Sequence, residues 1–230
     1  LLLERCNSEE SGLNIKDENG ATALMWACYN GHKDVVTLLL DSNIEELNAR
    51  SNYGDTAFMA ACSNGHKDVV QLLLDFPEIE LNARTNEGST PLMWACLNGH
   101  KDVVQLLLDH SERLDLNARN NHGNTALMAA CRNGHKDVVQ LLLDHSEIEL
   151  NARSNNGLTP LMWACLNGQK NVVQLLLNHS ERLDLNARNN HGGTALMAAC
   201  YIGHKDVVKL FLDHSEIIDL NARDYDGNTA

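Results

Sequence analysis

The chain has 230 residues with 31 acidic and 18 basic side chains, which gives a formal net charge of −13. This balance excludes a nucleic-acid-binding surface as the main feature, because neutralising phosphates requires clustered lysine and arginine. No apolar run approaches the roughly 20 residues of a membrane span, and no signal-peptide pattern is visible. We therefore expect neither a nucleic-acid partner nor direct membrane insertion.

One stretch recurs along the chain. Its third copy, from Thr90 to Leu108, has the sequence TPLMWACLNGHKDVVQLLL. The glycine two residues before the threonine recurs every 34 or 35 residues. A fixed period in this range indicates one supersecondary unit that is stacked many times. The other copies start at Thr22, Thr56, Thr125, Thr159 and Thr194.

Each copy predicts two short helices. Thr90 and Pro91 are typical of a helix start, since threonine caps free N–H groups and proline fits the first helical position. Gly99 is expected to end this helix in the left-handed conformation. A second helix begins at Lys101, and its valines and leucines surround most of it, so we expect it to be covered on several sides. A polar run and a turn at 120–123 then complete the unit.

The pattern G-x-T-P-L-x-x-A-C-x-x-G-H-x-x-V-V-x-L-L-L, followed by L-N-A, resembles the ankyrin repeat. The resemblance implies an all-α fold, an ankyrin-repeat solenoid of stacked helix-turn-helix units with projecting β-turn or hairpin loops, which forms a single domain over residues 1–230. Six full copies cover residues 17–50, 51–84, 85–119, 120–153, 154–188 and 189–223, and partial copies cover 1–16 and 224–230.

The two ends of the sequence resemble interrupted repeats. Leu1, Leu2 and Leu3 match the end of a second helix, and the last three residues match the start of a first helix. Solenoids need polar capping repeats at their ends, and neither end shows one. We therefore expect the chain to be part of a longer array or of a larger protein.

Two departures from the family pattern have structural consequences. Methionine replaces the histidine of the family's T-P-L-H, so the usual Thr–His hydrogen bonding is absent and a flexible apolar side chain fills the space. The family's Gly-Ala-Asp after the second helix is replaced by longer acidic connections, so we expect this helix to end without a glycine cap. The methionines are Met25, Met59, Met93, Met128, Met162 and Met197.

Six of the seven cysteines occupy the same position in successive copies, and Cys6 lies outside this series. Equivalent helices should lie roughly 8–10 Å apart, beyond the approximately 7 Å limit between the Cα atoms of a disulfide, and no C-x-x-C pair suggests zinc. We interpret the six as small apolar residues of the helix interface. Free thiols favour a reducing intracellular compartment, cytoplasmic or nuclear. They are Cys28, Cys62, Cys96, Cys131, Cys165 and Cys200.

The histidines also follow the repeat. One row comes after the glycine between the two helices, where the family braces its loops, and Gln169 takes that place in the fifth copy. A feature present in several copies belongs to the scaffold, whereas a catalytic site is expected once. No nucleophile, carboxylate pair, phosphate-binding loop or zincin pattern stands in a distinct context. We expect no enzymatic activity, no metal, no cofactor and no small-molecule substrate.

The copies differ most clearly at the position after the methionine, which alternates between tryptophan and alanine. This position shares a helix face with the residues three and four positions later. By resemblance, that face and the turn tips line a concave groove where partners dock, and tryptophan is enriched among binding hot spots. The alternative is that each indole packs against the next repeat, where alanine leaves room. The alternating residues are Trp26, Ala60, Trp94, Ala129, Trp163 and Ala198.

These variable positions define the predicted partner-binding surface. The first helices contribute Trp26, Tyr29, Trp94, Leu97, Trp163, Leu166 and Tyr201. The turn tips, which usually carry specificity on a rigid scaffold, contribute Tyr53, Asp55, Glu87, His122, Asn124, Asn156, Leu158 and His191.

We therefore predict a non-enzymatic scaffold that binds a partner protein in the concave groove formed by first helices and turn tips. The alternative is a targeting or substrate-recruiting module of a longer protein whose activity lies outside this chain. By resemblance, that protein would be a ubiquitin-ligase adaptor, a pathogen or viral effector, or a channel with a cytosolic domain. We expect a monomer, with end-to-end stacking through uncapped ends as the alternative.

Each L-N-A-R segment adds an arginine and an asparagine. The arginines are expected to pair with acidic residues of the next repeat, and the alternative is a partner-binding stripe. The asparagines are expected to hydrogen-bond their own turn, and the resemblance implies a second role as sites for an asparaginyl dioxygenase. The arginines are Arg50, Arg84, Arg119, Arg153, Arg188 and Arg223. The asparagines are Asn48, Asn82, Asn117, Asn151, Asn186 and Asn221.

Overall fold

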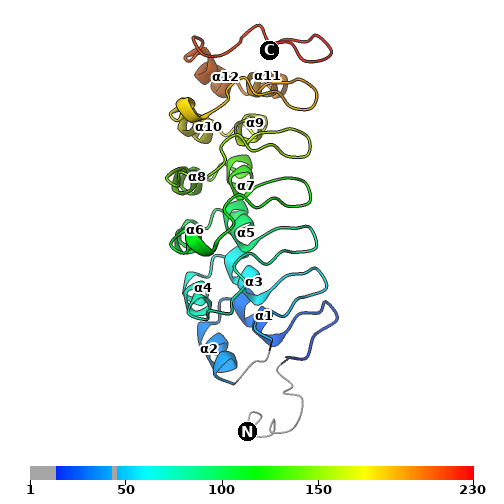
Figure 1. Cartoon of the computed structure of the whole chain (residues 1–230), viewed down its shortest axis with the longest axis vertical. Coiled ribbons are helices and arrows are strands. Elements are labelled where there is room, and N and C mark those ends of the chain that lie inside the picture. The colour runs from blue at the N-terminus through cyan, green and yellow to red at the C-terminus, as the bar shows by residue number, and fades with distance from the viewer. Residues whose placement is uncertain (1–13, 43–45) are drawn as a thin grey trace. The chain divides into compact units, whose positions relative to one another are not determined.

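The computed structural model describes residues 14–42 and 46–230 (Figure 1). Within these residues the regular structure is helical, with no β-strand, which confirms the predicted all-α class. Leu1, Leu2, Leu3 and Cys6, with most of the partial repeat 1–16, lie outside the described residues. The division of 1–230 into repeats within one domain stays a prediction.

The chain divides into two compact units. Unit 1 contains the described residues up to Ala95 together with Asp102–Asp115, and unit 2 contains Cys96–Lys101 and Leu116–Ala230. The helices that lie wholly or mostly in unit 1 are α1 (Ala23–Tyr29), α2 (Lys33–Asp41), α3 (Ala57–Ser63), α4 (Lys67–Leu74), α5 (Pro91–Asn98), α6 (Lys101–Leu108) and the 3-10 helix η3 (Ser111–Arg113). Those of unit 2 are α7 (Ala126–Asn133), α8 (Lys136–Leu143), α9 (Pro160–Leu166), α10 (Lys170–Leu177), the 3-10 helix η4 (Ser180–Arg182), α11 (Ala195–Ile202) and α12 (Lys205–Leu212).

The first helix of each pair begins and ends as the sequence predicts. The hydroxyl oxygen of Thr56 accepts a hydrogen bond from the backbone N–H of Met59 at 3.2 Å, and the same threonine cap recurs before the other first helices. Gly134 follows α7 with a φ of 77°, the left-handed conformation that releases the chain into the next helix. The predicted caps are therefore confirmed at both ends.

The second helices bury their branched side chains. On α4, Val69, Val70 and Leu73 are buried, whereas Gln71 is exposed. The helix ends at Leu74 and is followed by Asp75, whose backbone is right-handed, so the predicted absence of a glycine cap is confirmed. Five of the six methionines at the family's histidine position are buried, as a space-filling role requires, and Met197 is half-buried.

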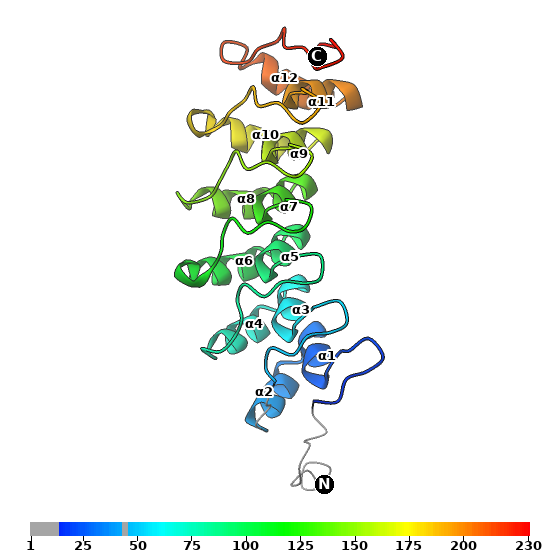
Figure 2. The ribbon, with the colours of Figure 1, turned by 45° about the vertical axis from the view of Figure 1, so that its right-hand side comes forward.

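Within each unit the helix pairs stack with the same layering (Figures 1 and 2). First helices lie between the projecting turns and the second helices, and α1 packs on α3 in unit 1, as α9 packs on α7 and α11 in unit 2. The turns are also linked: the backbone N–H of Asn52 donates to the carbonyl of Asn19 at 2.9 Å, and its side chain donates to the carbonyl of Glu18 at 3.0 Å. One face of each unit thus presents first helices and turn tips.

Two negative findings apply to the part of the chain that the structure describes. None of its helices combines the length and apolar character that crossing a bilayer requires. Its histidine, cysteine and acidic side chains do not gather in any group of three or more that could hold a metal ion.

Candidate interaction groove

A groove of about 440 Å³ lies on the face of unit 1 formed by first helices and turns. It brings together five residues that the sequence predicts for partner binding: Trp26, Tyr29, Tyr53, Asp55 and Trp94. We call this hollow the Trp26–Trp94 groove. Its floor includes buried Met25, Thr56 and Met59 of the repeat cores.

The tryptophan–alanine alternation explains the groove. Ala60 occupies in α3 the position that Trp26 holds in α1 and Trp94 in α5, and all three residues line the hollow. Because alanine has only a methyl group, the space between the two indoles is not filled by the repeat between them. Ser63, another small residue, lines the groove one helical turn after Ala60.

Trp26 is held in place at one wall of the groove. Its indole N–H donates to Oδ2 of Asp17 at 3.0 Å, and its ring meets Tyr29 edge-on with centroids 5.9 Å apart. Trp26 nevertheless remains 47% exposed, and Tyr29 and Tyr53 are 51% and 64% exposed. Such an accessible aromatic cluster gives a surface with large apolar contact area and little rotamer freedom to lose.

The groove carries negative charge and no basic side chain among the residues that line it. Asp55 is half-buried, and desolvation raises its pKa although a hydrogen bond from Ser51 opposes the shift. Beside the wall, backbone N–H donation from Ala21, with further donors that include Trp26, lowers the pKa of Asp17. The lowered pKa keeps the Asp17 carboxyl ionised near neutral pH.

The tryptophan of unit 2, Trp163, contacts an arginine side chain. The guanidinium carbon of Arg132, at the end of α7, lies 5.1 Å from the centroid of the Trp163 ring on α9. Trp163 is half-buried, and its indole nitrogen, like that of Trp94, is buried without a hydrogen-bond partner among the described residues. Trp163 therefore contacts the preceding repeat through Arg132 and keeps part of its side chain at the surface, whereas the contacts of Trp26 with Asp17 and Tyr29 lie within its own repeat.

The other predicted residues vary in accessibility. Tyr201 is 88% exposed on α11, whereas Leu97, Leu166, Asn124 and Leu158 are half-buried. Exposed positions at the turn tips are those of Glu87, His122, Asn156 and His191. Their role in partner binding stays a prediction.

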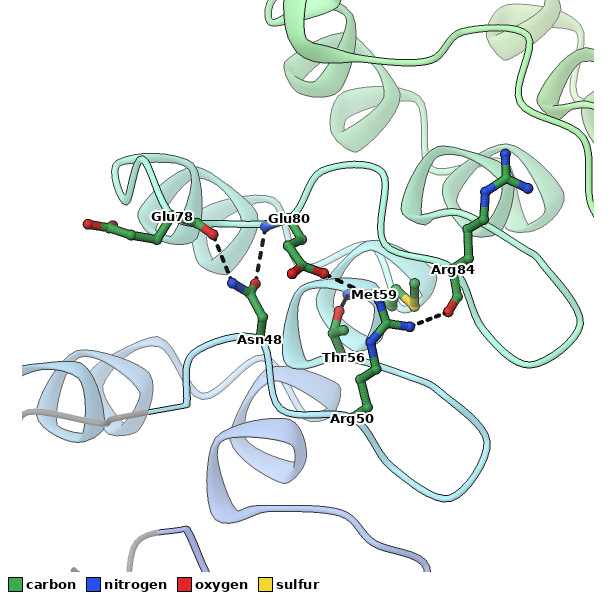
Figure 3. Close-up of polar contacts among 7 residues, drawn as sticks. All are labelled: Asn48, Arg50, Thr56, Met59, Glu78, Glu80 and Arg84. Atoms are coloured by element: carbon green, nitrogen blue, oxygen red, sulfur yellow. Dashed lines mark hydrogen bonds and ion pairs between the residues drawn. The ribbon is translucent and has the colours of Figure 1, made fainter.

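Asparagine and arginine of the L-N-A-R segment form a brace between repeats (Figure 3). The side chain of Asn48 donates to the carbonyl of Glu78 at 2.8 Å and accepts from the backbone N–H of Glu80 at 3.1 Å. Arg50 donates to the carbonyl of Arg84 at 2.5 Å and contacts the Glu80 carboxylate at 3.3 Å.

The brace recurs in both units, and it revises one prediction. Asn82, Asn117, Asn151 and Asn186 make the same pair of bonds to the following repeat. The expected bond to their own turn is wrong at these positions, because the longer connections bring the next segment's backbone within reach. Hydroxylation of these asparagines stays a prediction.

The predicted pairing of the arginines is confirmed in part. Arg50, Arg84 and Arg119 pair with carboxylates of the next repeat at 3.3, 3.9 and 3.3 Å. Arg153 donates instead to the carbonyl of Arg188, and Arg188 donates to the carbonyl of Arg223. These bonds assign the arginine row to repeat stacking.

The buried thiols fit the interface role that the sequence indicates. Cys28, Cys62, Cys96, Cys131 and Cys165 are free and buried, and Cys200 is half-buried. Burial raises the pKa of the Cys28 thiol to about 12 and raises that of Cys62 well above its usual range. A thiol that resists ionisation is a poor nucleophile and metal ligand, so the cysteines act as packing groups.

Sequence reasoning missed three residues that shape this face: Asp17, Ser63 and Arg132. A comparison of the position three residues after Trp or Ala would have found two of them. That position carries Tyr29, Ser63, Leu97, Arg132, Leu166 and Tyr201. Arg132 is the single charged residue of this row, and Ser63 is its smallest member.

Comparison with known proteins agrees with the geometry. A family model described as "Ankyrin repeats (3 copies)" matches residues 1–85, 76–154, 112–189 and 146–224, which together cover nearly the whole chain.

Curated relatives match over a much shorter stretch. The chain is 51% identical over 45 residues to "Osteoclast-stimulating factor 1" of Monopterus albus, 50% over 44 residues to the protein of the same name from Xenopus laevis, and 48% over 44 residues to that from Sus scrofa. Each match covers 19 or 20% of this chain and 21% of the relative. The chain thus spans about a fifth of the length of these relatives, and the likeness concerns the repeats.

Proposed function

Because the chain belongs to the ankyrin-repeat family, whose repeats form a non-catalytic protein–protein interaction module, we propose that it binds a partner protein on the face of first helices and turn tips. The Trp26–Trp94 groove is the observation that carries this proposal. It is preformed and lined by aromatic side chains with the carboxyl group of Asp55 among them, a composition that suits a specific protein contact.

The energetics favour this face over the opposite one. Trp26 and Tyr29 already have fixed positions, since the Asp17 bond and the ring contact hold Trp26 and the capped α1 holds Tyr29. The backbone of Tyr53 is held by hydrogen bonds to Ser51 and Asn86. A partner that covers them removes apolar surface from water without ordering a loop, and this lowers the entropic cost of binding. The second helices offer no comparable cluster of tryptophan and tyrosine.

The free thiols bear on the cellular compartment of the protein. Free cysteines at every described repeat position support a reducing intracellular location, cytoplasmic or nuclear, as part of the same proposal.

The proposal is tested by affinity capture from a eukaryotic lysate with three immobilised chains: the wild type, Trp26→Ala/Trp94→Ala/Trp163→Ala, and a control in which exposed Gln71 and Gln105 are changed to alanine. Circular dichroism first establishes that all three are folded. We expect the same partner with the wild type and the control and its loss with the triple variant. Equal capture by the triple variant would assign binding to another surface.

A further inference from the structure

We propose that the Trp26–Trp94 groove binds an arginine side chain of the partner, seated over the ring of Trp94 as Arg132 is seated over the ring of Trp163. The inference rests on the proposed function and specifies the chemistry of what the groove takes. It depends on a contact that the chain makes with itself in unit 2.

In unit 2 the chain supplies its own cation. Arg132 lies at the end of one first helix, and its guanidinium carbon is 5.1 Å from the centroid of Trp163 on the next first helix, 31 residues later. A planar guanidinium stacks on an aromatic face and meets the negative potential of the ring. The contact shows that the surface between two successive first helices accommodates an arginine side chain.

In unit 1 the corresponding place lacks this cation. Ser63 occupies in α3 the position of Arg132 in α7, and Trp94 follows it after the same 31 residues. Ser63 and Trp94 both line the open groove. A hydroxymethyl group is too short to cover the indole face, so the region that Arg132 covers in unit 2 is accessible in unit 1.

The lining of the groove has further features that suit a cation. Tyr29 and Tyr53 add two exposed phenol rings to the indoles. Asp55 contributes a half-buried carboxylate to the lining, and none of the lining residues is basic. A positive group in this place would gain aromatic contacts and a carboxylate partner together, and the net charge of −13 would favour its approach.

The guanidinium of arginine fits these features better than the ammonium of lysine. It is flat, so it can stack on Trp94 while its edge N–H groups remain free to donate to Asp55. Lysine would keep its charge but lose the stacked plane. The proposal therefore commits to an arginine side chain of the partner protein.

The experiment uses the whole chain labelled with ¹⁵N and follows its three tryptophan indole N–H signals, assigned by single Trp→Phe variants. The probes are the blocked peptide Gly-Ser-Arg-Ser-Gly and the same peptide with citrulline or leucine in place of arginine. Citrulline keeps the planar shape of arginine without its charge. We expect the arginine peptide to move the Trp26 and Trp94 signals in a saturable way and to leave Trp163 in place. The citrulline peptide should bind about fivefold or more weakly.

Two variants exchange serine and arginine beside the tryptophans, and a third serves as a control. Arg132→Ser should uncover Trp163, so that its signal also responds to the arginine peptide, whereas Lys136→Ser removes the same charge from the same repeat and should leave Trp163 silent. Ser63→Arg should move the Trp94 signal without any peptide and abolish the response to the arginine peptide.

The outcomes separate this inference from the function on which it rests. Equal responses to citrulline or leucine would show that the groove binds peptide but does not select a cation, which overturns the inference and leaves the proposed function standing. No response to any peptide at millimolar concentration overturns the inference as well. The proposed function is then tested separately by the affinity-capture experiment. A Trp163 response in the wild type would contradict the assigned role of Arg132.

Discussion

Gln169 donates its side-chain amide to the backbone carbonyl of Arg132 at 3.1 Å, in the place where other repeats use a histidine. His66, His135 and His204 donate through Nε2 to the carbonyls of Tyr29, Leu97 and Leu166 at 2.8–3.2 Å. The ring and the amide are interchangeable here because only one N–H at the right distance is required. These bonds hold the carbonyls of the residues three positions after Trp or Ala, which belong to the face of first helices.

This equivalence predicts that His135→Gln is nearly neutral, within about 0.5 kcal/mol. His135→Ala should cost about 1 kcal/mol, because it leaves the Leu97 carbonyl without its donor. Urea unfolding followed by circular dichroism measures both. A His135→Gln variant as unstable as His135→Ala would show that the ring itself packs in a way that the amide cannot replace.

The asparagine brace predicts a position-dependent loss of stability. Asn117 donates to the carbonyl of Glu147 at 2.8 Å and accepts from the N–H of Glu149 at 2.9 Å. Removing both bonds in Asn117→Ala should cost about 2 kcal/mol. The matched control is Asn221→Ala, since the Asn221 side chain makes no such pair within the described residues and its loss should cost under about 0.5 kcal/mol. Equal unfolding midpoints for the two variants would refute the brace.

The buried thiols predict that stability falls in alkali. Burial raises the pKa of Cys28 from 9.0 to about 12, so the thiol stays protonated in the folded chain while it ionises in the unfolded chain. The stabilisation is therefore fully present below pH 9 and declines as the pH rises from 9 toward 12. Cys28→Ala should reduce the slope of the free energy of unfolding against pH in this range. An unchanged slope would show that the thiol ionises equally in both states.

The bond between Asp17 and Trp26 predicts an acid titration that the indole reports. Donors to the Asp17 carboxylate, with the Ala21 N–H the largest contributor, lower its pKa below 3.8. The Trp26 indole N–H signal should therefore shift as the pH falls through this lowered pKa, with its midpoint below 3.8. Asp17→Asn, which keeps an acceptor without a titrating proton, should make the signal independent of pH. A midpoint at or above 3.8 in the wild type would contradict the geometry.

Much of the fold was predictable because its determinants are local and recur. Thr56 before α3, Gly134 after α7 and Pro160 at the start of α9 act within one helical turn, so the sequence shows them directly. Cysteine burial was predictable for a related reason, because the same small residue at one repeat position has the same neighbours each time. The asparagine bonds were not, since their partners lie about 30 residues away and depend on the path of the connection.

The groove was predictable only in part. The alternation of Trp26, Ala60 and Trp94 indicated an aromatic face, but its accessibility depends on the neighbouring repeat. Arg132 covers Trp163, while Ser63 leaves Trp94 open, and this difference arises from one side chain in a row that the helix pattern does not mark. A periodic sequence thus predicts the scaffold better than the differences that carry specificity.

The central claim is that a partner protein binds on the face that holds the Trp26–Trp94 groove, and site-specific photo-crosslinking tests it most directly. Tyr53, 64% exposed at the groove, is replaced by p-benzoylphenylalanine, and exposed Gln71 on α4 is replaced in a matched chain. We predict that one and the same partner protein becomes covalently attached from position 53 and not from position 71, and that Trp94→Ala weakens the attachment. Attachment from position 71 alone would contradict the account.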